Sequence, residues 1–345
     1  MNPYALFIIF FSLGLGTTLT ISSSNWMLAW MGLEINTLAI IPMMINTHHP
    51  RATEATTKYF LTQATAATLI LFATTINAWT TGQWEIKEMT PIASNTLTIA
   101  LTMKLGLAPL HFWLPEVMQG ISLMTGLILS TWQKIAPMVL IYMSSNSLNT
   151  TLLFTFGIMS ALVGGWGGLN QTQTRKILAY SSIAHMGWMI TIMTISPYLA
   201  MLNFLLYLIL TTSLFIIMII LNATKINSLS NSWSKMPTLT ALSSILLLSL
   251  GGLPPTTGFM PKWLILNELI KQHTVTVATI MAFSALLSLF FYLRMTYSIA
   301  LTQSPNTMTS STMWKYKLNQ WTSTLTLLMI ISLFLLPITP NILSW

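Results

Sequence analysis

Long apolar stretches recur along the chain, and short segments rich in Pro, Asn, Ser and charged residues separate them. A helix of about twenty apolar residues matches the thickness of the bilayer core. The pattern therefore predicts an all-α polytopic membrane protein with eleven transmembrane helices. We expect these helices near residues 3–22, 25–45, 58–80, 93–116, 122–143, 150–170, 177–196, 198–222, 238–270, 275–298 and 322–342.

Two of these spans, 93–116 and 238–270, are longer than one crossing requires, and each contains a Gly-Leu-x-Pro sequence. Proline removes a backbone donor and clashes with the preceding turn, and backbone exposed to lipid cannot tolerate that loss. We therefore expect each span to consist of two half-helices. The short unwound segment between them should be buried in protein or face a wet cavity.

An ungapped shift that moves residue 106 onto residue 252 aligns the two interrupted spans. It places Gly106-Leu107-Ala108-Pro109 on Gly252-Leu253-Pro254-Pro255, Trp113 on Phe259, and Pro115-Glu116 on Pro261-Lys262. Because these spans are the fourth and the ninth, their repeat units begin on opposite membrane faces, as in transporters with an ion path near the midplane. The predicted organisation is a single transmembrane domain at 1–345, with inverted repeats at 3–143 and 150–298 and a C-terminal helix at 322–342.

Most cations fall in the connections that follow even-numbered spans, or near the same face. These are Arg51, Lys58, Arg175, Lys176, Lys225, Lys235, Arg294, Lys315 and Lys317, whereas the odd-numbered connections hold Lys87 and Lys271. Short loops rich in Lys and Arg face the inner compartment of a membrane system. The N-terminus is therefore predicted on that side and, with an odd number of spans, the C-terminus on the other.

Composition limits the classes of chemistry that the chain can perform. Of its 345 residues 54% are hydrophobic and 6% are charged, which excludes a soluble globular enzyme. The sequence has no cysteine, so we expect no thiolate-bound iron–sulfur cluster, no cysteine zinc site and no disulfide. His48 and His49 lack further ligands at metal spacing. No cofactor or metal is therefore predicted within this chain, and its net charge of +8, spread over loops, is unlike a nucleic-acid interface.

Three ionisable residues lie in the middle of predicted spans: Glu34, Lys104 and Lys134. Each costs roughly 2.5–3.5 kcal/mol at bilayer depth unless it is paired or hydrated. One interpretation is an ion pair that only holds helices together. The other is a proton relay, because burial disfavours a charged ammonium while a nearby carboxylate favours it, so that a small rearrangement can load or unload a lysine. Three such residues together with two interrupted helices favour the relay.

Lys262, His111 and His185 are further candidates for this relay. Lys262 follows the second interruption and could instead extend to the membrane surface, but its place in the repeat favours a role in the path. His111, between two prolines, could bond freed backbone carbonyls or act as a titrating relay. His185 lies mid-span beside Ser181 and Ser182 and could connect the two halves, although a buried histidine with a purely structural role fits equally well.

Two other features have simpler interpretations. The sequence Gly164-Gly165-Trp166-Gly167-Gly168 predicts close helix packing or a flexible helix end. Glu116 is interpreted as a carboxylate at a helix end or at the membrane surface.

Six motifs occur along the chain in this order: MNPYALFIIF, NWMLAWMGLEINTLAIIPMM, KLGLAPLHFWLPEVMQG, WQKIAP, RKILAYSSIAHMGWM and GGLPPTTGFMPKW. Together they resemble the subunit 2 family of mitochondrial NADH:ubiquinone oxidoreductase, respiratory complex I, in its vertebrate form. The resemblance covers the whole chain. That family belongs with the antiporter-like subunits, which are related to components of cation/proton antiporters, and its animal members lack three N-terminal helices of their bacterial relatives.

The resemblance implies a core membrane-arm subunit that takes part in proton translocation, driven by electron transfer in other subunits. It also implies individual roles in that path: Glu34 pairs with the channel lysine Lys104, Lys134 is the connecting lysine, Lys262 faces the exit side, and His111 and His185 contribute to a central hydrophilic axis.

The same resemblance implies the surroundings of the chain. Its partners would be other membrane-arm and accessory subunits and membrane phospholipids, with cardiolipin as a candidate. NADH, FMN, iron–sulfur clusters and ubiquinone would belong to partner subunits. The chain would lie in the mitochondrial inner membrane, with its N-terminus in the matrix and its C-terminus in the intermembrane space. The alternatives are a stand-alone cation/proton antiporter and a purely structural membrane subunit.

Overall fold

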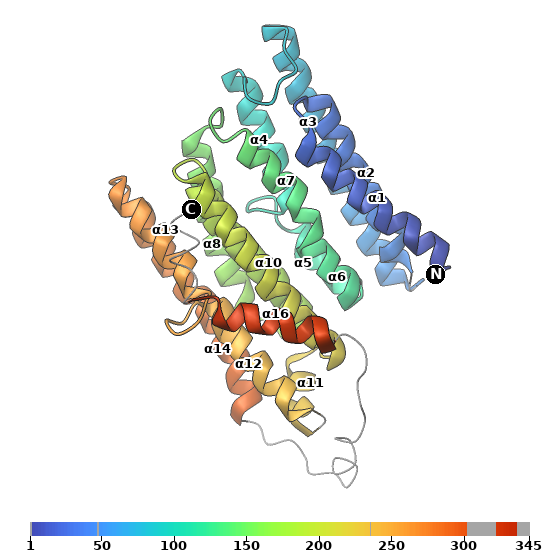
Figure 1. Ribbon diagram of the computed structural model, residues 1–345, viewed down its shortest axis with the longest axis vertical. Coiled ribbons are helices and arrows are strands. Elements are labelled where there is room, and N and C mark those ends of the chain that lie inside the picture. Colours follow the sequence, from blue (N-terminus) through green and yellow to red (C-terminus); the bar gives the residue numbers. More distant parts are fainter. Residues whose placement is uncertain (1, 47, 235, 302–321, 337–345) are drawn as a thin grey trace. The chain divides into compact units, whose positions relative to one another are not determined.

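The structure is a computed structural model that describes residues 2–46, 48–234, 236–301 and 322–336. These residues form helices and no β-strand (Figure 1), which confirms the predicted all-α class. Lys235, Lys315, Lys317 and the end of the predicted C-terminal span lie outside them. The helices are α1 (Pro3–Ser22), α2 (Trp26–Ile45), α3 (Pro50–Thr81), α4 (Pro91–Leu105), α5 (Trp113–Gly120), α6 (Leu123–Ser130), α7 (Trp132–Met143), α8 (Thr150–Gly168), α9 (Thr174–Ile192), α10 (Pro197–Ile220), α11 (Ile226–Ser230), the 3-10 helix η1 (Asn231–Ser234), α12 (Pro237–Gly251), α13 (Phe259–Lys271), α14 (Val275–Leu301) and α16 (Thr322–Phe334).

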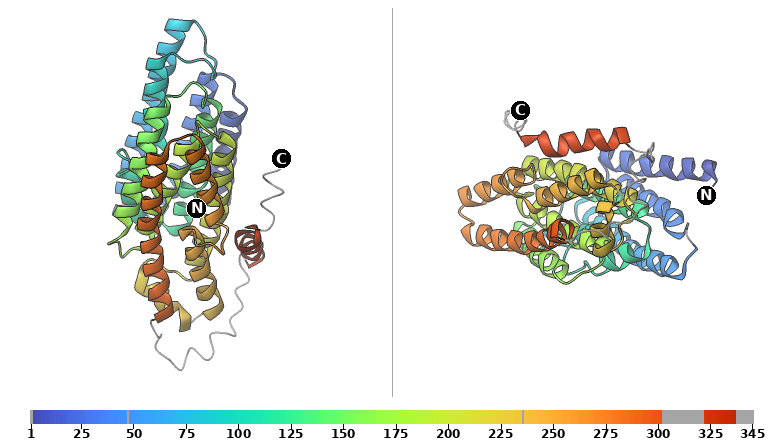
Figure 2. Two further views of the ribbon diagram at one scale, coloured as in Figure 1. Left: turned by 90° about the vertical axis from the view of Figure 1, so that its left-hand side faces the viewer. Right: turned by 90° about the horizontal axis from the view of Figure 1, so that it is seen from below.

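The chain divides into two compact units. The first unit contains residues 1–160 and 189–197, and the second contains residues 161–188 and 198–345. Within the first unit, α1 packs on α2, α2 packs on α3, and α3 packs on both α4 and α5 (Figure 1). Within the second unit, α12 and α13 both pack on the long helix α14 (Figure 2).

Seven helical stretches among the described residues are long and apolar enough to cross a bilayer. One of them is Leu123–Met143, which comprises α6 and α7. The other four predicted spans fall on α9, on α16 and on the half-helix pairs α4–α5 and α12–α13. Helix α9 is less apolar than the seven because it contains Arg175 and Lys176 in its first turn and Ser181, Ser182 and His185 in its middle.

Both predicted helix interruptions are present, and both begin with a glycine cap. Gly106 ends α4 with φ +75° and Gly252 ends α12 with φ +82°, a left-handed conformation that glycine adopts without a Cβ penalty. In each cap the glycine N–H and the following N–H donate to carbonyls of the last turn. The unwound segments are 106–112 and 252–258. The sequence shift that aligns residue 106 with residue 252 therefore aligns the two segments along their whole length.

Two helix boundaries differ from those expected. Helix α3 begins at Pro50 rather than near residue 58, because proline suits the first helical position and the His49 side chain accepts a hydrogen bond from the Arg51 N–H. The span expected at 122–143 is divided at Thr131, where φ is −113° and ψ is −68°. The residues at this point, Ser130-Thr131-Trp132-Gln133-Lys134, include neither proline nor glycine, so the signal that marks the other two interruptions is missing here.

Glycines bring α1 and α2 into close contact in the first unit. A Cβ atom at Gly16 would lie 2.9 Å from the Gly32 carbonyl oxygen, and one at Gly32 would lie 2.7 Å from the Thr20 side chain. Lipid tails are as apolar as the helix surfaces, so helices in a bilayer associate through such close packing and not through burial of apolar area alone.

The glycine-rich end of α8 has the same role in the second unit. A Cβ at Gly164 would lie 2.6 Å from the Ala184 backbone nitrogen of α9, and one at Gly168 would lie 2.8 Å from the Phe291 ring of α14. The predicted close packing at this motif is therefore confirmed. It places α8 against α9 and α14.

We expect the substitution Gly16→Ala to weaken the α1–α2 contact. Alanine normally favours a helix over glycine by about 1 kcal/mol, but here the added methyl group would have to displace backbone atoms, which costs about 1–3 kcal/mol. The control is Gly14→Ala in the same helix, where no atom lies within 4 Å of the new methyl group. Thermal unfolding of the purified protein in its native assembly should show a lower midpoint for Gly16→Ala alone, and equal midpoints would contradict the packing.

Candidate functional site

The first unit contains a narrow internal cavity, here called the first-unit cavity, between α2, α3, α4, α5 and α7. The volume open to the centre of a water molecule is about 10 Å³, roughly the minimum for one water. Both lysines that the sequence placed mid-span in this unit line the cavity. The complete lining is Leu33, Asn36, Thr37, Tyr59, Gln63, Lys104, Leu105, Trp113, Leu114, Leu129, Gln133, Lys134 and Pro137.

Lys104 lies in the last turn of α4, directly before the glycine cap, with only 6% of its surface exposed. The Met103 carbonyl in the same turn accepts a hydrogen bond of 3.2 Å from the Trp113 indole of α5. The indole is thus a second donor to this carbonyl, which also accepts from the Gly106 N–H at 3.1 Å. The Lys104 ammonium itself has no hydrogen-bond partner among the residues that the structure describes.

Glu34 on α2 provides the negative charge that acts on this lysine. Its carboxylate interacts electrostatically with Lys104 and with Tyr59. One carboxylate oxygen, Oε2, is buried and, like the Lys104 ammonium, has no hydrogen-bond partner in the described part of the chain. The two charged groups therefore influence one another without a direct hydrogen bond.

Lys134 follows the division of the fifth span, three residues beyond Thr131. It is 3% exposed and lines the same cavity as Lys104. Both lysines that line this cavity thus lie next to a helix interruption. The sequence indicated the interruption beside Lys104 but gave no signal for the one beside Lys134.

A polar network that we did not predict crosses the first-unit cavity. The Tyr59 hydroxyl donates to the Gln133 side-chain oxygen at 3.4 Å, and the Gln133 amide donates to the Asn36 carbonyl and side-chain oxygens at 3.2 and 3.1 Å. These contacts join α3, α7 and α2. The available signal was an amide beside each predicted charge, because Asn36 follows Glu34 by two residues and Gln133 precedes Lys134.

Lys262 is buried in the second unit and does not extend to the membrane surface. It is 8% exposed, and its ammonium donates to the Gly251 carbonyl at 2.8 Å and to the Leu250 carbonyl at 3.4 Å. These are the last carbonyls of α12, so the lysine caps the half-helix at its negative dipole end. A Cβ at Gly252 would lie 2.9 Å from this ammonium, and glycine at this position therefore leaves room for it.

His185 and Lys262 line one cavity in the second unit, here called the second-unit cavity. Its complete lining is His185, Trp188, Asn203, Leu206, Tyr207, Leu210, Gly258, Pro261 and Lys262. The His185 ring lies 5.6 Å from the Tyr207 ring, and its Nε2 atom lies 3.4 Å from the Tyr292 hydroxyl. Tyr207 and Tyr292 are residues that sequence reasoning did not single out.

His111 lines neither of these two cavities. It lies within the first interruption, where its Nδ1 atom is 3.3 Å from the Pro109 carbonyl oxygen. A carbonyl can only accept, so Nδ1 carries a proton and donates. Of the two interpretations drawn from the sequence, this contact matches the partner for a freed backbone carbonyl.

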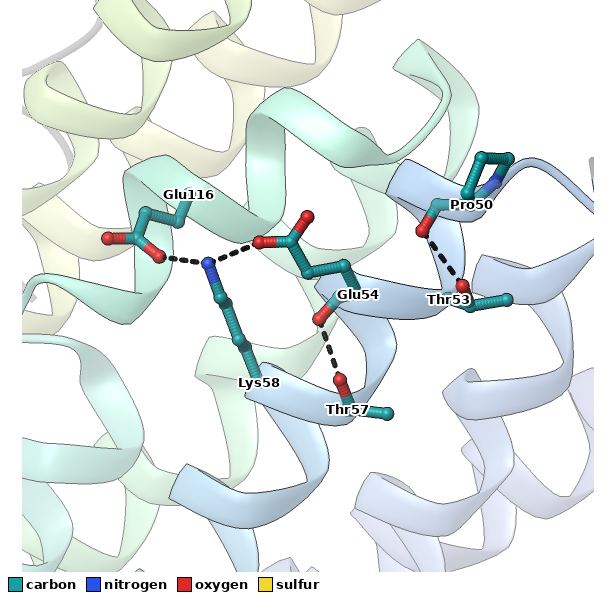
Figure 3. Close-up of polar contacts among 6 residues, drawn as sticks. All are labelled: Pro50, Thr53, Glu54, Thr57, Lys58 and Glu116. Atoms are coloured by element: carbon teal, nitrogen blue, oxygen red, sulfur yellow. Dashed lines mark hydrogen bonds and ion pairs between the residues drawn. The ribbon is translucent and has the colours of Figure 1, made fainter.

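Glu116 forms part of an exposed ion-pair cluster between α3 and α5 (Figure 3). The Lys58 ammonium lies 2.7 Å from a carboxylate oxygen of Glu116 and 2.7 Å from one of Glu54. All three side chains are well exposed, so these pairs contribute little to stability. Their position fits the expected carboxylate at a helix end, and they tie α5 to α3.

Two protein families and a curated relative match this chain. The family described as NADH:quinone oxidoreductase/Mrp antiporter, TM, matches residues 23–288, and the family described as NADH dehydrogenase subunit 2 C-terminus matches residues 289–343. The chain is 60% identical to NADH-ubiquinone oxidoreductase chain 2 of Polypterus ornatipinnis, over 100% of this chain and 99% of that one.

Solved structures share the fold at low sequence identity. A chain of respiratory complex I from Thermus thermophilus with bound aureothin matches 96% of this chain and 78% of its own length, with a TM-score of 0.80 and 22% identity. A chain of the membrane-bound sulfane sulfur reductase, an archaeal respiratory membrane complex, matches 96% of this chain and 72% of its own, with a TM-score of 0.82 and 18% identity.

The amide network predicts a stability effect. Gln133→Leu preserves the size of the side chain but leaves the Asn36 side-chain oxygen and the Tyr59 hydroxyl without this partner. A buried polar group that loses its partner costs about 1–3 kcal/mol. The thermal unfolding midpoint should fall for Gln133→Leu and stay unchanged for the control Gln83→Leu, whose side chain is exposed. A similar midpoint for both variants would show that the network contributes nothing.

Proposed function

This chain belongs to the NADH-ubiquinone oxidoreductase chain 2 family, and we propose that it carries protons through the membrane arm by a relay of buried lysines. The relay comprises Glu34, Lys104, Lys134, Lys262, His111 and His185. The observation that supports it best is the pair of lysines in the first-unit cavity, which lie beside helix interruptions, with Glu34 acting electrostatically on Lys104.

In the first unit the proposed step is proton exchange between Lys104 and Lys134. Both ammonium groups border a cavity of the size of one water molecule, which can pass a proton between groups that do not touch. Glu34 favours the charged form of Lys104, so any movement of the carboxylate changes how readily that lysine releases its proton. The lack of a direct ion pair leaves the lysine free to exchange.

In the second unit the proposed step involves His185 and Lys262. Both border the second-unit cavity, and a neutral imidazole can accept a proton at one nitrogen and release one at the other. His111 is proposed to act from the first interruption, where its Nδ1 proton is held by a backbone carbonyl. Glu34, Lys104, Lys134 and His111 would thus serve the first unit, and His185 and Lys262 the second.

The oxidation of NADH and the reduction of ubiquinone are proposed to take place in partner subunits. The chain has no cysteine to hold an iron–sulfur cluster, so the clusters are assigned to those partners. FMN, NADH and ubiquinone are proposed to bind there too. Other membrane-arm subunits and accessory subunits would surround the chain. Phospholipids, with cardiolipin among them, would bind near the cation-rich connections, because anionic headgroups are attracted by Lys and Arg.

Topology is part of the same proposal. We infer inverted repeats at 3–143 and 150–298, supported by interruptions that correspond residue for residue and carry equivalent glycine caps. The distribution of cations supports an N-terminus in the matrix and a C-terminus in the intermembrane space, across the mitochondrial inner membrane.

The relay is tested by Lys104→Met and Glu34→Gln in the assembled complex. Both substitutions remove a charge while they preserve size, so we expect normal assembly and a rate of proton translocation lowered roughly tenfold or more. The measurement is NADH-driven acidification of proteoliposomes. Lys87→Met, at an exposed position, is the control. If assembly and translocation both persist in the two variants, the chain has only a structural role.

A second test concerns the cap formed by Lys262. Gly252→Ala adds the cost of a positive φ, about 1–2 kcal/mol, and also pushes the Lys262 ammonium from its place. Gly82→Ala is the matched control, because Gly82 has φ +74° and no atom within 4 Å of an added Cβ. Thermal stability should fall for both variants, and proton translocation should fall for Gly252→Ala alone. If Gly252→Ala translocates protons at the parent rate, the contact of Lys262 with the end of α12 plays no part in the proposed relay.

A further inference from the structure

We propose that two buried amides, Gln63 in the first unit and Asn203 in the second, are positioning residues that each hold one water molecule beside the lysines of their cavity. The inference rests on the proposed function, because it gives this water a place in the lysine relay. It deepens that function by naming the side chains that orient the water.

Both amides are buried, and both line a cavity. Gln63 on α3 is 5% exposed and lines the first-unit cavity, and Asn203 on α10 is 4% exposed and lines the second-unit cavity. Neither side chain makes a hydrogen bond to a residue that the structure describes. Buried amides in proteins are normally satisfied by other protein groups or by bound water. The two side chains therefore require a partner, and the cavities are where one can lie.

Each cavity has room for a single water molecule. The volume open to the centre of a water molecule is about 10 Å³ in the second-unit cavity, as it is in the first. A buried water also requires roughly two to four polar partners. A primary amide can meet part of this requirement in two ways, because its oxygen accepts hydrogen bonds and its N–H groups donate them.

In the first unit the hydrogen bonds between side chains leave suitable groups open. The Gln133 amide nitrogen donates to the Asn36 main-chain carbonyl, which can only accept, so the Gln133 oxygen faces Tyr59 and accepts from its hydroxyl. The Tyr59 oxygen can therefore still accept a hydrogen bond, and the Lys104 ammonium can still donate. Tyr59 precedes Gln63 by one turn of α3, and both side chains line the cavity with Lys104.

The second unit offers a similar set of groups. Lys262 uses two of its three N–H bonds on the carbonyls of Leu250 and Gly251, so the third is available to the cavity that this lysine lines. The amide again lies one turn from a buried tyrosine, because Tyr207 follows Asn203 by one turn of α10. Helices α3 and α10 are the third and the eighth span, so they hold equivalent places in the proposed repeats.

The proposed role of Gln63 is to hold the water while protons pass through it. The Lys104 ammonium gives one proton to the water, and the water gives another proton to the neutral amine of Lys134, so the water is restored. The Gln63 amide keeps its hydrogen bond to the water and neither gains nor loses a proton. It therefore orients the transfer without carrying charge.

A cryo-EM map of the assembled complex that resolves ordered water tests the two sites directly. We expect one water in each cavity, within hydrogen-bond distance of the Gln63 amide in the first unit and of the Asn203 amide in the second. A cavity without water would overturn the inference. A water that contacts a lysine but not the amide would overturn it too. This test uses the unmodified chain and depends on no variant.

Gln63→Leu and Asn203→Leu remove each amide at similar side-chain volume. We expect each variant to lower NADH-driven proton translocation about fivefold, the effect of losing one neutral hydrogen bond. The solvent deuterium isotope effect should rise, because proton transfer through a poorly oriented water then limits the rate. The controls Gln83→Leu and Asn46→Leu remove exposed amides and should change neither quantity. A parent rate in either buried variant, or a lower rate with the parent isotope effect, would overturn the inference.

Failure of this inference and failure of the proposed function give different results. If Lys104→Met translocates protons at the parent rate, the relay fails and the inference fails with it. If Lys104→Met is impaired and Gln63→Leu is not, the inference alone fails. Should Gln63→Leu not assemble, Gln63→Met, which is unbranched and of similar length, takes its place and is judged by the same rate and isotope effect.

Discussion

A backbone carbonyl released from a helix inside a bilayer must find a donor within the protein or in water that the protein admits, because lipid offers none. This constraint organises the first interruption of the chain. There the Trp113 indole donates to the Met103 carbonyl, and the His111 imidazole donates to the Pro109 carbonyl. The Lys104 ammonium next to these carbonyls takes no part in capping, since it has no hydrogen-bond partner among the described residues.

The second interruption meets the same requirement in a different way. It begins with the same glycine cap, but the aromatic residue at the start of the next half-helix is Phe259, whose side chain has no N–H to donate. Lys262, one turn further on, reaches back to the last carbonyls of α12 instead. The two interruptions are alike in backbone, but their lysines differ. The Lys104 ammonium has no hydrogen-bond partner in the described part of the chain, whereas the Lys262 ammonium is bound to the end of a helix.

The parts that could be predicted are those in which a side chain conflicts with a membrane helix. A proline after Gly-Leu or a charge in mid-span is costly, so each stands out from the apolar sequence, and both interruptions and the buried lysines were located in this way. The division at Thr131 and the contacts of Tyr59, Gln133 and Tyr292 carried no such signal. Polar residues of this kind are tolerated once the fold supplies a partner, and the partner can lie far away in the sequence. Gln133, for example, contacts Asn36, which lies 97 positions earlier in the chain. Lipid and protein interior are equally apolar, so the pattern also cannot tell which face of a helix meets which neighbour.

Because Lys262 contacts two carbonyls, the end of α12 can stay closed whether or not this lysine is charged. An ammonium has three N–H bonds and the neutral amine has two, one for each of the carbonyls of Gly251 and Leu250. Departure of a proton therefore leaves enough donors for both acceptors, and the end of α12 is not opened by the change of charge. In the proposed relay the helix end and the charge carrier would share one side chain, and loss of a proton from Lys262 would not require the end of α12 to open in every cycle.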